Sequence, residues 1–218
     1  MNLTLKESLV TRSRVFSPWT AFYFLQSLLI NLGLGYPFSL LYTAAFTAIL
    51  LLLWRTLPRV QKVLVGVSSL VAACYFPFAQ AYGAPNFNTL LALHSTNMEE
   101  STEILTIFPW YSYMVGIFIF VLGVIAIRRK KKSEKARWNT FDSLCLVFSV
   151  ATFFVAPVQN LAWGGVFKLK DTGYPVFRFA KDVIVNNNEV IEEQERMAKL
   201  SGMKDTWTVT AVKPKYQT

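Results

Sequence analysis

Long stretches without charge constrain this chain more than any other feature of its sequence. The segment 108–127, FPWYSYMVGIFIFVLGVIAI, contains no Lys, Arg, Asp or Glu. A helix of about 20 residues rises about 30 Å, which is the thickness of the hydrocarbon core of a bilayer. A soluble domain interrupts its apolar residues every few positions, so this segment predicts a helix that crosses a membrane.

Four further segments resemble it in length and composition, and hydrophobic residues make up 53% of the 218 residues. The five predicted spans are about 18–34, 37–54, 61–82, 108–127 and 140–158. A tight turn at Gly35–Pro37 would join the first two, and Pro77 would kink the third, where neighbouring helices compensate the lost hydrogen bond. The predicted fold class is therefore all-α, a polytopic membrane bundle of five transmembrane helices that occupies residues 1–160.

The Lys and Arg residues predict the orientation of this bundle. The N-terminal tail carries three of them, the connection between the second and third spans three, and the connection between the fourth and fifth spans seven. The connections 35–36 and 83–107 carry none. Because Lys and Arg accumulate in cytoplasmic connections, the N-terminus is predicted to be cytoplasmic and 83–107 to lie on the other side. Topology explains the net charge of +9, and no nucleic-acid partner is predicted.

Residues 161–218 are predicted to form a linker on the side opposite the N-terminus. Within it, 175–200 mixes apolar and charged residues in a loosely helical rhythm, with Gly202 as a plausible stop, and 205–212 alternates as a strand does. One helix and one strand cannot build a core of their own, so the linker is expected to lead to a further domain or to a partner. The apolar positions expected to lie on the membrane or on a partner domain are Val176, Phe179, Val183, Val190 and Met197.

A short polar stretch, ALHSTNMEESTEIL at 92–105, holds all the acidic residues between positions 8 and 133 and the only histidine of the chain, His94. A purely structural interpretation accounts for much of it. Thr96 and Glu99 fit a capping box at the start of a helix, and Asn86 or Asn88 fits the start of another short helix through NTLLALH. Two short helices over the rim of a bundle would follow from this interpretation.

A functional interpretation uses the same spacing. On a helix that starts near residue 97, Glu99 and Glu103 lie one turn apart, and so do Thr96 and Glu100. Such carboxylates can hold the ammonium group of a lipid headgroup through charge-assisted hydrogen bonds. One histidine beside glutamates does not predict a zinc site, because zinc usually takes three or four protein ligands.

The Thr-Asn-x-x-Glu-Ser run at 96–101, the five-span layout and the final KPKYQT together resemble the N-terminal membrane domain of bacterial phosphoethanolamine transferases. This family modifies lipid A or the lipopolysaccharide core and includes the mobile colistin-resistance enzymes, which confer polymyxin resistance. The resemblance implies the inner membrane of a Gram-negative bacterium, a periplasmic C-terminal tail, phosphatidylethanolamine as donor, and lipid A or lipopolysaccharide as acceptor.

Carried over by position, the resemblance implies that Thr96 and Glu100 contact the donor headgroup, with Glu99, Glu103, Asn88 and His94 as further candidates. An Asn that lipid A-modifying members place one turn before this Thr is Ala92 here. The family's catalytic Thr and zinc ligands belong to a soluble alkaline-phosphatase-like domain, expected after Thr218. Residues 1–218 are therefore expected to supply no catalytic residue, metal ligand or cofactor.

Two other functions fit the layout. A non-catalytic inner-membrane scaffold could use the periplasmic tail to recruit a partner protein. A small transporter fits less well, because the spans lack the buried charges typical of ion or proton paths, and Asp142 lies near a span end.

Overall fold

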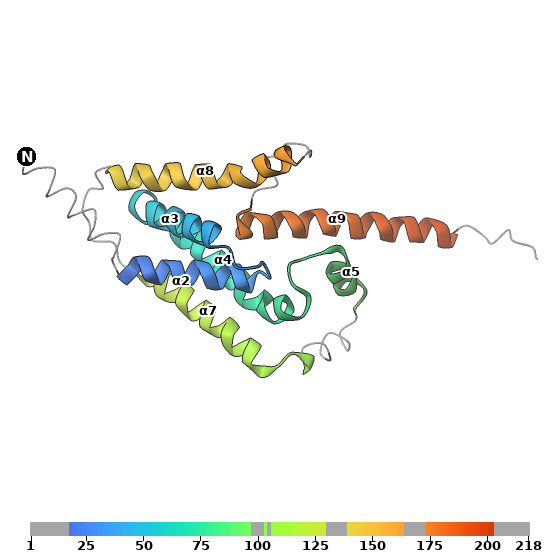
Figure 1. The fold of residues 1–218 in the computed structure, drawn as a ribbon. Helices are drawn as coiled ribbons and strands as arrows, with labels where there is room; N and C mark the ends of the chain where they lie inside the picture. The colour runs from blue at the N-terminus through green and yellow to red at the C-terminus, as the bar shows by residue number, and fades with distance from the viewer. Residues whose placement is uncertain (1–17, 97–102, 104–105, 130–138, 164–172, 203–218) are drawn as a thin grey trace, which may run out of the picture.

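The computed structural model describes residues 18–96, 103, 106–129, 139–163 and 173–202 (Figure 1). Every regular element in these ranges is a helix, which confirms the all-α prediction for this part of the chain. The elements are α2 (Pro18–Gly33), α3 (Leu40–Thr56), α4 (Pro58–Tyr82), α5 (Phe87–Ser95), α7 (Trp110–Arg128), α8 (Thr140–Ala162) and α9 (Pro175–Gly202).

Five of these helices correspond to the five predicted spans. α4, α7 and α8 are long and apolar enough to cross a membrane. α3 is a shorter apolar helix of 17 residues, and α2 has 16 residues, so each is about 25 Å long. A helix therefore lies at each of the five predicted spans, but only three of the five meet the length and hydropathy expected of a crossing segment, so five membrane crossings are not confirmed.

The helix boundaries differ from the predicted ones by three or more residues at three places. α4 begins at Pro58 rather than 61. α3 begins at Leu40 rather than 37, because Ser39 adopts the extended backbone of an N-cap residue, with φ −134° and ψ 112°. α8 continues to Ala162, beyond the predicted end at 158, although Pro157 lies inside it. A proline inside a membrane helix is tolerated where other groups satisfy the freed backbone carbonyl.

Small and polar residues bring the helices of the bundle together. A side chain at Gly116 of α7 would lie 2.7 Å from the carbonyl oxygen of Ala73, and one at Gly123 would lie 2.6 Å from the Cβ of Ser69. α4 and α7 therefore pack as closely as small residues permit, which is how membrane helices gain contact area. Gln26 also donates a buried hydrogen bond of 2.7 Å to the Ser69 hydroxyl and so ties α2 to α4.

The two ends of the bundle differ in the turns and side chains that lie there. Gly35 turns with φ +79°, and a side chain there would meet the carbonyl carbon of Gly83 at 2.4 Å, so the turns after α2 and α4 touch. Together with α5 and the start of α9 they form what we call the α9 end. At the opposite, basic end, Arg55 forms an ion pair with Asp142, and the Arg129 guanidinium lies 3.6 Å from the Trp54 ring centroid.

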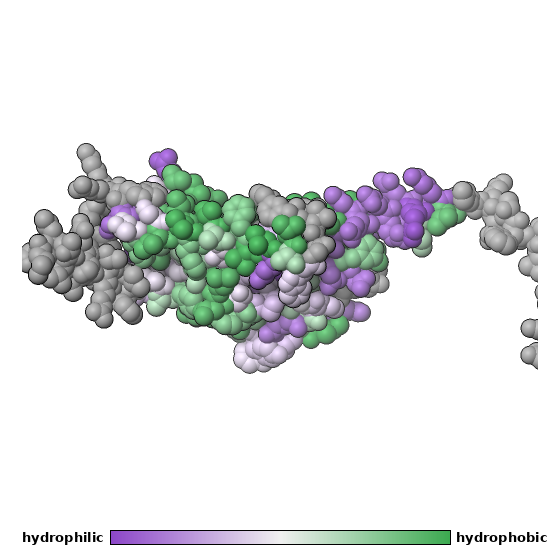
Figure 2. Space-filling model, turned by 45° about the horizontal axis from the view of Figure 1, so that its top comes forward, coloured by the Kyte–Doolittle hydropathy of each residue, from purple (hydrophilic) through white to green (hydrophobic). Residues whose placement is uncertain are grey.

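Among the described residues, the turns after α2 and α4, which carry no Lys or Arg, lie at one end, and Arg55 and Arg129 lie at the other. Apolar side chains cover the bundle, whereas hydrophilic ones gather on α9, which extends beyond it (Figures 1 and 2). Outward-facing residues such as Val63 and Val147, each 65% exposed, suit contact with lipid rather than water. The apolar helices thus indicate a membrane protein.

Candidate donor-lipid site at the α9 end

The helix α5 positions part of the predicted site. Asn86 is its N-cap, and the side-chain oxygen of Asn86 accepts a hydrogen bond of 3.0 Å from the Thr89 amide. This confirms Asn86 as one of the two predicted helix starts. The helix ends at Ser95, and Thr96 is its C-cap, with a hydroxyl that donates to the Ala92 carbonyl. Thr96 therefore closes one helix, while the capping box with Glu99 lies outside the described residues.

Four of the six predicted headgroup-binding residues lie in the described part of the chain. Asn88 and His94 are exposed on α5, Thr96 is half-buried at the end of α5, and Glu103 is exposed on the way to α7. No hydrogen bond joins any two of these four, so the structure groups three of them only through their common helix. Glu99 and Glu100 lie outside the described residues.

The helix α9 lies beside α5 and contacts it through polar side chains. His94 Nε2 lies 2.8 Å from the Asn187 side-chain oxygen. The side-chain amide of Asn186 donates a hydrogen bond to the Pro85 carbonyl at 3.5 Å. This pairing was not predicted from the sequence. The run of three asparagines at 186–188, in a helix otherwise rich in charge, was the available signal.

A second polar contact holds α9 to the turn between α2 and α3. The Tyr36 hydroxyl donates a hydrogen bond of 2.8 Å to the Asp182 carboxylate. Arg178 lies 3.6 Å from the same carboxylate and 5.0 Å over the Tyr36 ring. Burial, and then the Asp182 carboxylate, raise the pKa of the Tyr36 hydroxyl well above its ordinary value. Tyr36 therefore stays protonated, and remains a donor, throughout the physiological pH range.

The apolar residues of α9 contact a different surface from the one predicted. Val190 is fully buried, Val176 and Phe179 pack against the bundle core, and the Phe179 ring lies 5.0 Å from that of Tyr75. The predicted stripe was assigned to the membrane or to a partner domain, and this was wrong for these three positions. They pack on the chain's own helices, whereas Met197 is 58% exposed.

A comparison with curated proteins decides the family resemblance. The chain is 98% identical over all 218 residues to the phosphoethanolamine transferase OpgE of Escherichia coli (strain K12). The resemblance to a phosphoethanolamine transferase is confirmed. The chain spans 41% of the length of OpgE. No family model matches the chain, and no solved structure matches it.

No three His, Cys, Asp or Glu side chains among the described residues gather closely enough to hold a metal ion. Zinc, implied by the family resemblance, therefore has no ligand set in these ranges. The C-terminal end of α5 presents carbonyl groups and the negative end of a helix dipole, which favour a cation such as an ammonium group.

Proposed function

We propose that the chain is the membrane-embedded part of a phosphoethanolamine transferase that moves phosphoethanolamine from phosphatidylethanolamine to lipid A or the lipopolysaccharide core. The identity of 98% with OpgE over the whole chain carries this proposal. Because the chain spans 41% of that relative, the transfer itself is assigned to the longer protein. The segment 1–160 would anchor it and present the donor, and 161–218 would link it to a soluble domain that holds the zinc and the nucleophile.

All five bundle helices cross the inner membrane in this proposal, with the basic end in the cytoplasm and the α9 end in the periplasm. The turns after α2 and α4 carry no Lys or Arg and meet at the α9 end, which supports this orientation because Lys and Arg mark cytoplasmic connections. The hydrophilic surface of α9 (Figure 2) suits a helix that leaves the membrane and leads toward a soluble domain.

The donor headgroup would bind beside the C-terminal end of α5. Thr96 closes that helix, and Glu100 follows four residues later. The carboxylate of Glu100 would hold the ammonium group, assisted by the helix dipole and by Glu99 and Glu103, with Asn88 and His94 along α5 as outer contacts. Ala92 stands in place of the Asn of lipid A-modifying members, so the proposal keeps both lipid A and a core sugar or another glycan as acceptors.

The test is a transfer assay in OpgE that carries these 218 residues as its matching segment. Glu100→Gln is expected to lower kcat/KM for phosphatidylethanolamine at least about tenfold, because one charge-assisted hydrogen bond to the ammonium is lost. The matched control is Glu195→Gln on the exposed surface of α9, which should leave transfer unchanged. Equal transfer by the Glu100→Gln variant and the unmodified enzyme would exclude the donor-site role and favour the scaffold function.

A further inference from the structure

A cavity of about 180 Å³ lies at the basic end, opposite α5. It is formed where α3 passes into α4 and where α7 ends. Its lining residues are Trp54, Pro58, Arg59, Lys62 and Arg129. Three of these five carry positive charge and none carries negative charge, so the cavity favours an anion.

Two hydrogen-bond donors of this cavity are buried and have no acceptor. Trp54 Nε1 and Arg129 Nη1 lack a partner in the part of the chain that the structure describes. Stacking fixes the guanidinium, whose central carbon lies 3.6 Å from the Trp54 ring centroid and 4.1 Å from that of Trp19. Buried donors without acceptors are costly, and an oxygen-rich anion would satisfy both.

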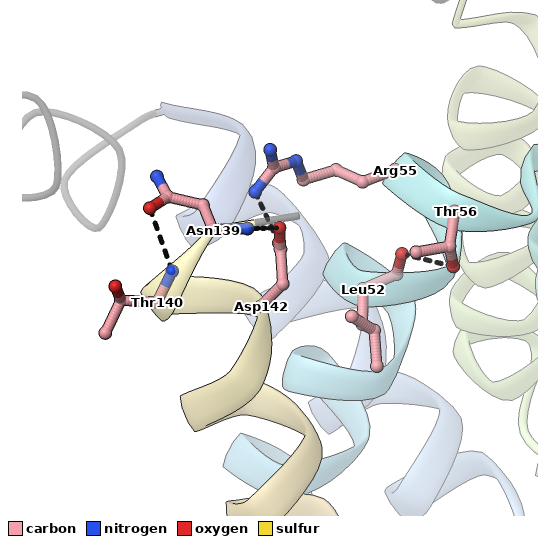
Figure 3. Close-up of polar contacts among 6 residues, drawn as sticks. All are labelled: Leu52, Arg55, Thr56, Asn139, Thr140 and Asp142. Atoms are coloured by element: carbon pink, nitrogen blue, oxygen red, sulfur yellow. Dashed lines mark hydrogen bonds and ion pairs between the residues drawn. The ribbon is translucent and has the colours of Figure 1, made fainter. Parts of the chain in front are cut away.

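Arg55, next to Trp54 in the sequence, differs from Arg129 because its Nη1 has an acceptor. Arg55 pairs with the Asp142 carboxylate. This carboxylate also accepts a hydrogen bond of 3.0 Å from the backbone N–H of Asn139 (Figure 3). Asp142 is therefore already engaged beside the cavity. The first turn of α4, which begins at Pro58, adds the positive end of a helix dipole to the cavity wall.

Exposed apolar residues lie next to the lining residues in the sequence where α4 begins. Leu57 is 55% exposed, Val60 48% and Val63 65%, and they alternate with the lining residues along the chain. A phosphate group that carries acyl chains would use both the cations and this apolar surface, whereas free phosphate would use only the cations.

We propose that this cavity binds the phosphate group of an anionic phospholipid at the membrane surface. The guanidinium of Arg129 and the indole N–H of Trp54 donate to the phosphate oxygens, Arg59 and Lys62 supply further positive charge, and the acyl chains lie along α4. The site is separate from the proposed donor site, since it lies at the other end of the bundle, and it does not depend on phosphoethanolamine transfer.

The test is native mass spectrometry of the full chain in detergent, titrated with phosphatidylglycerol, phosphatidylethanolamine or inorganic phosphate. The Arg59→Gln/Lys62→Gln variant is expected to bind phosphatidylglycerol about tenfold or more weakly, because two positive charges beside the phosphate are lost. The Trp54→Phe variant keeps a ring over Arg129 but removes the N–H donor, and a severalfold loss is expected. Helical content from circular dichroism checks that each variant folds.

The matched control is Arg128→Gln, which removes an exposed charge one residue away from Arg129 and outside the cavity. This control should keep the affinity for phosphatidylglycerol, and the unmodified chain should prefer phosphatidylglycerol over phosphatidylethanolamine. Equal losses in Arg128→Gln and Arg59→Gln/Lys62→Gln would reduce the effect to general surface charge and overturn the proposal. Inorganic phosphate that binds as tightly as phosphatidylglycerol would overturn the assignment to a lipid.

Discussion

Replacing Asp142 with alanine is expected to lower the free energy of unfolding by about 3–5 kcal/mol, the range for breaking a buried ion pair. The side chain of Asp142 is 3% exposed and that of Arg55 19%, so the variant removes the carboxylate that faces a largely buried positive charge. The same carboxylate accepts a hydrogen bond from the Asn139 amide in the capping box of α8 (Figure 3). The substitution therefore weakens both the α3–α8 contact and the start of α8. Unfolding of the chain by sodium dodecyl sulfate in mixed micelles, followed by circular dichroism, measures the loss.

Two further variants separate the contribution of the Arg55–Asp142 ion pair from that of the capping box of α8. Asp142→Asn keeps an oxygen acceptor for the Asn139 amide and should lose less than Asp142→Ala. The double variant Arg55→Leu/Asp142→Leu removes both charges and should recover part of the stability, because no unpaired charge is left. Glu189→Ala, on the exposed surface of α9, is the control for loss of an acidic residue. An Asp142→Ala variant as stable as this control would show that the ion pair contributes nothing.

Replacing Tyr174 with alanine is expected to cost about 3–5 kcal/mol, as for other large buried aromatic side chains. Tyr174 precedes α9 and is 1% exposed. Its hydroxyl donates to the Ser149 carbonyl at 2.8 Å, and its ring centroid lies 5.9 Å from that of Tyr42. The side chain therefore fixes the start of α9 between α3 and α8. Its removal should lower the unfolding midpoint and expose α9 to cleavage by trypsin at Arg178 and Lys181.

The conservative change Tyr174→Phe tests the division between ring and hydroxyl. It keeps the ring contacts and removes one hydrogen bond, so we expect a loss of about 1 kcal/mol and no new cleavage within α9. A phenylalanine variant as unstable as the alanine variant would show that the hydroxyl, rather than ring packing, holds α9 in place. An alanine variant with unchanged cleavage would show that Tyr174 does not position α9.

Local sequence patterns predicted much of the bundle. Uncharged apolar runs of sufficient length predict membrane helices directly, and turn residues such as Gly35 and caps such as Asn86 mark where helices stop and start. The boundaries of α3, α4 and α8 were less accurate. Ser39 takes the N-cap position of α3 without a side-chain hydrogen bond, and α8 continues past Pro157, as membrane helices can.

The contacts of α9 could not be predicted in the same way. A periodic stripe shows which face of a helix is apolar, but not which surface that face covers. The Tyr36–Asp182 hydrogen bond joins residues 146 positions apart, and His94 and Asn187 are 93 positions apart. Pairings at such separations depend on the packed bundle. In the candidate site, α5 was predicted from its N-cap, whereas its pairing with α9 was not.

The central claim is that α5 and α9 lie on the periplasmic side, where the donor headgroup would be presented. The most direct test uses single cysteines in a Cys74→Ala/Cys145→Ala background, labelled with a membrane-impermeant maleimide. Asn88→Cys on α5 and Glu192→Cys on α9 should react in cells whose outer membrane alone is permeable, whereas Arg59→Cys should react only after the inner membrane is opened. Reaction of Arg59→Cys before opening, with protection of the other two, would contradict the claim.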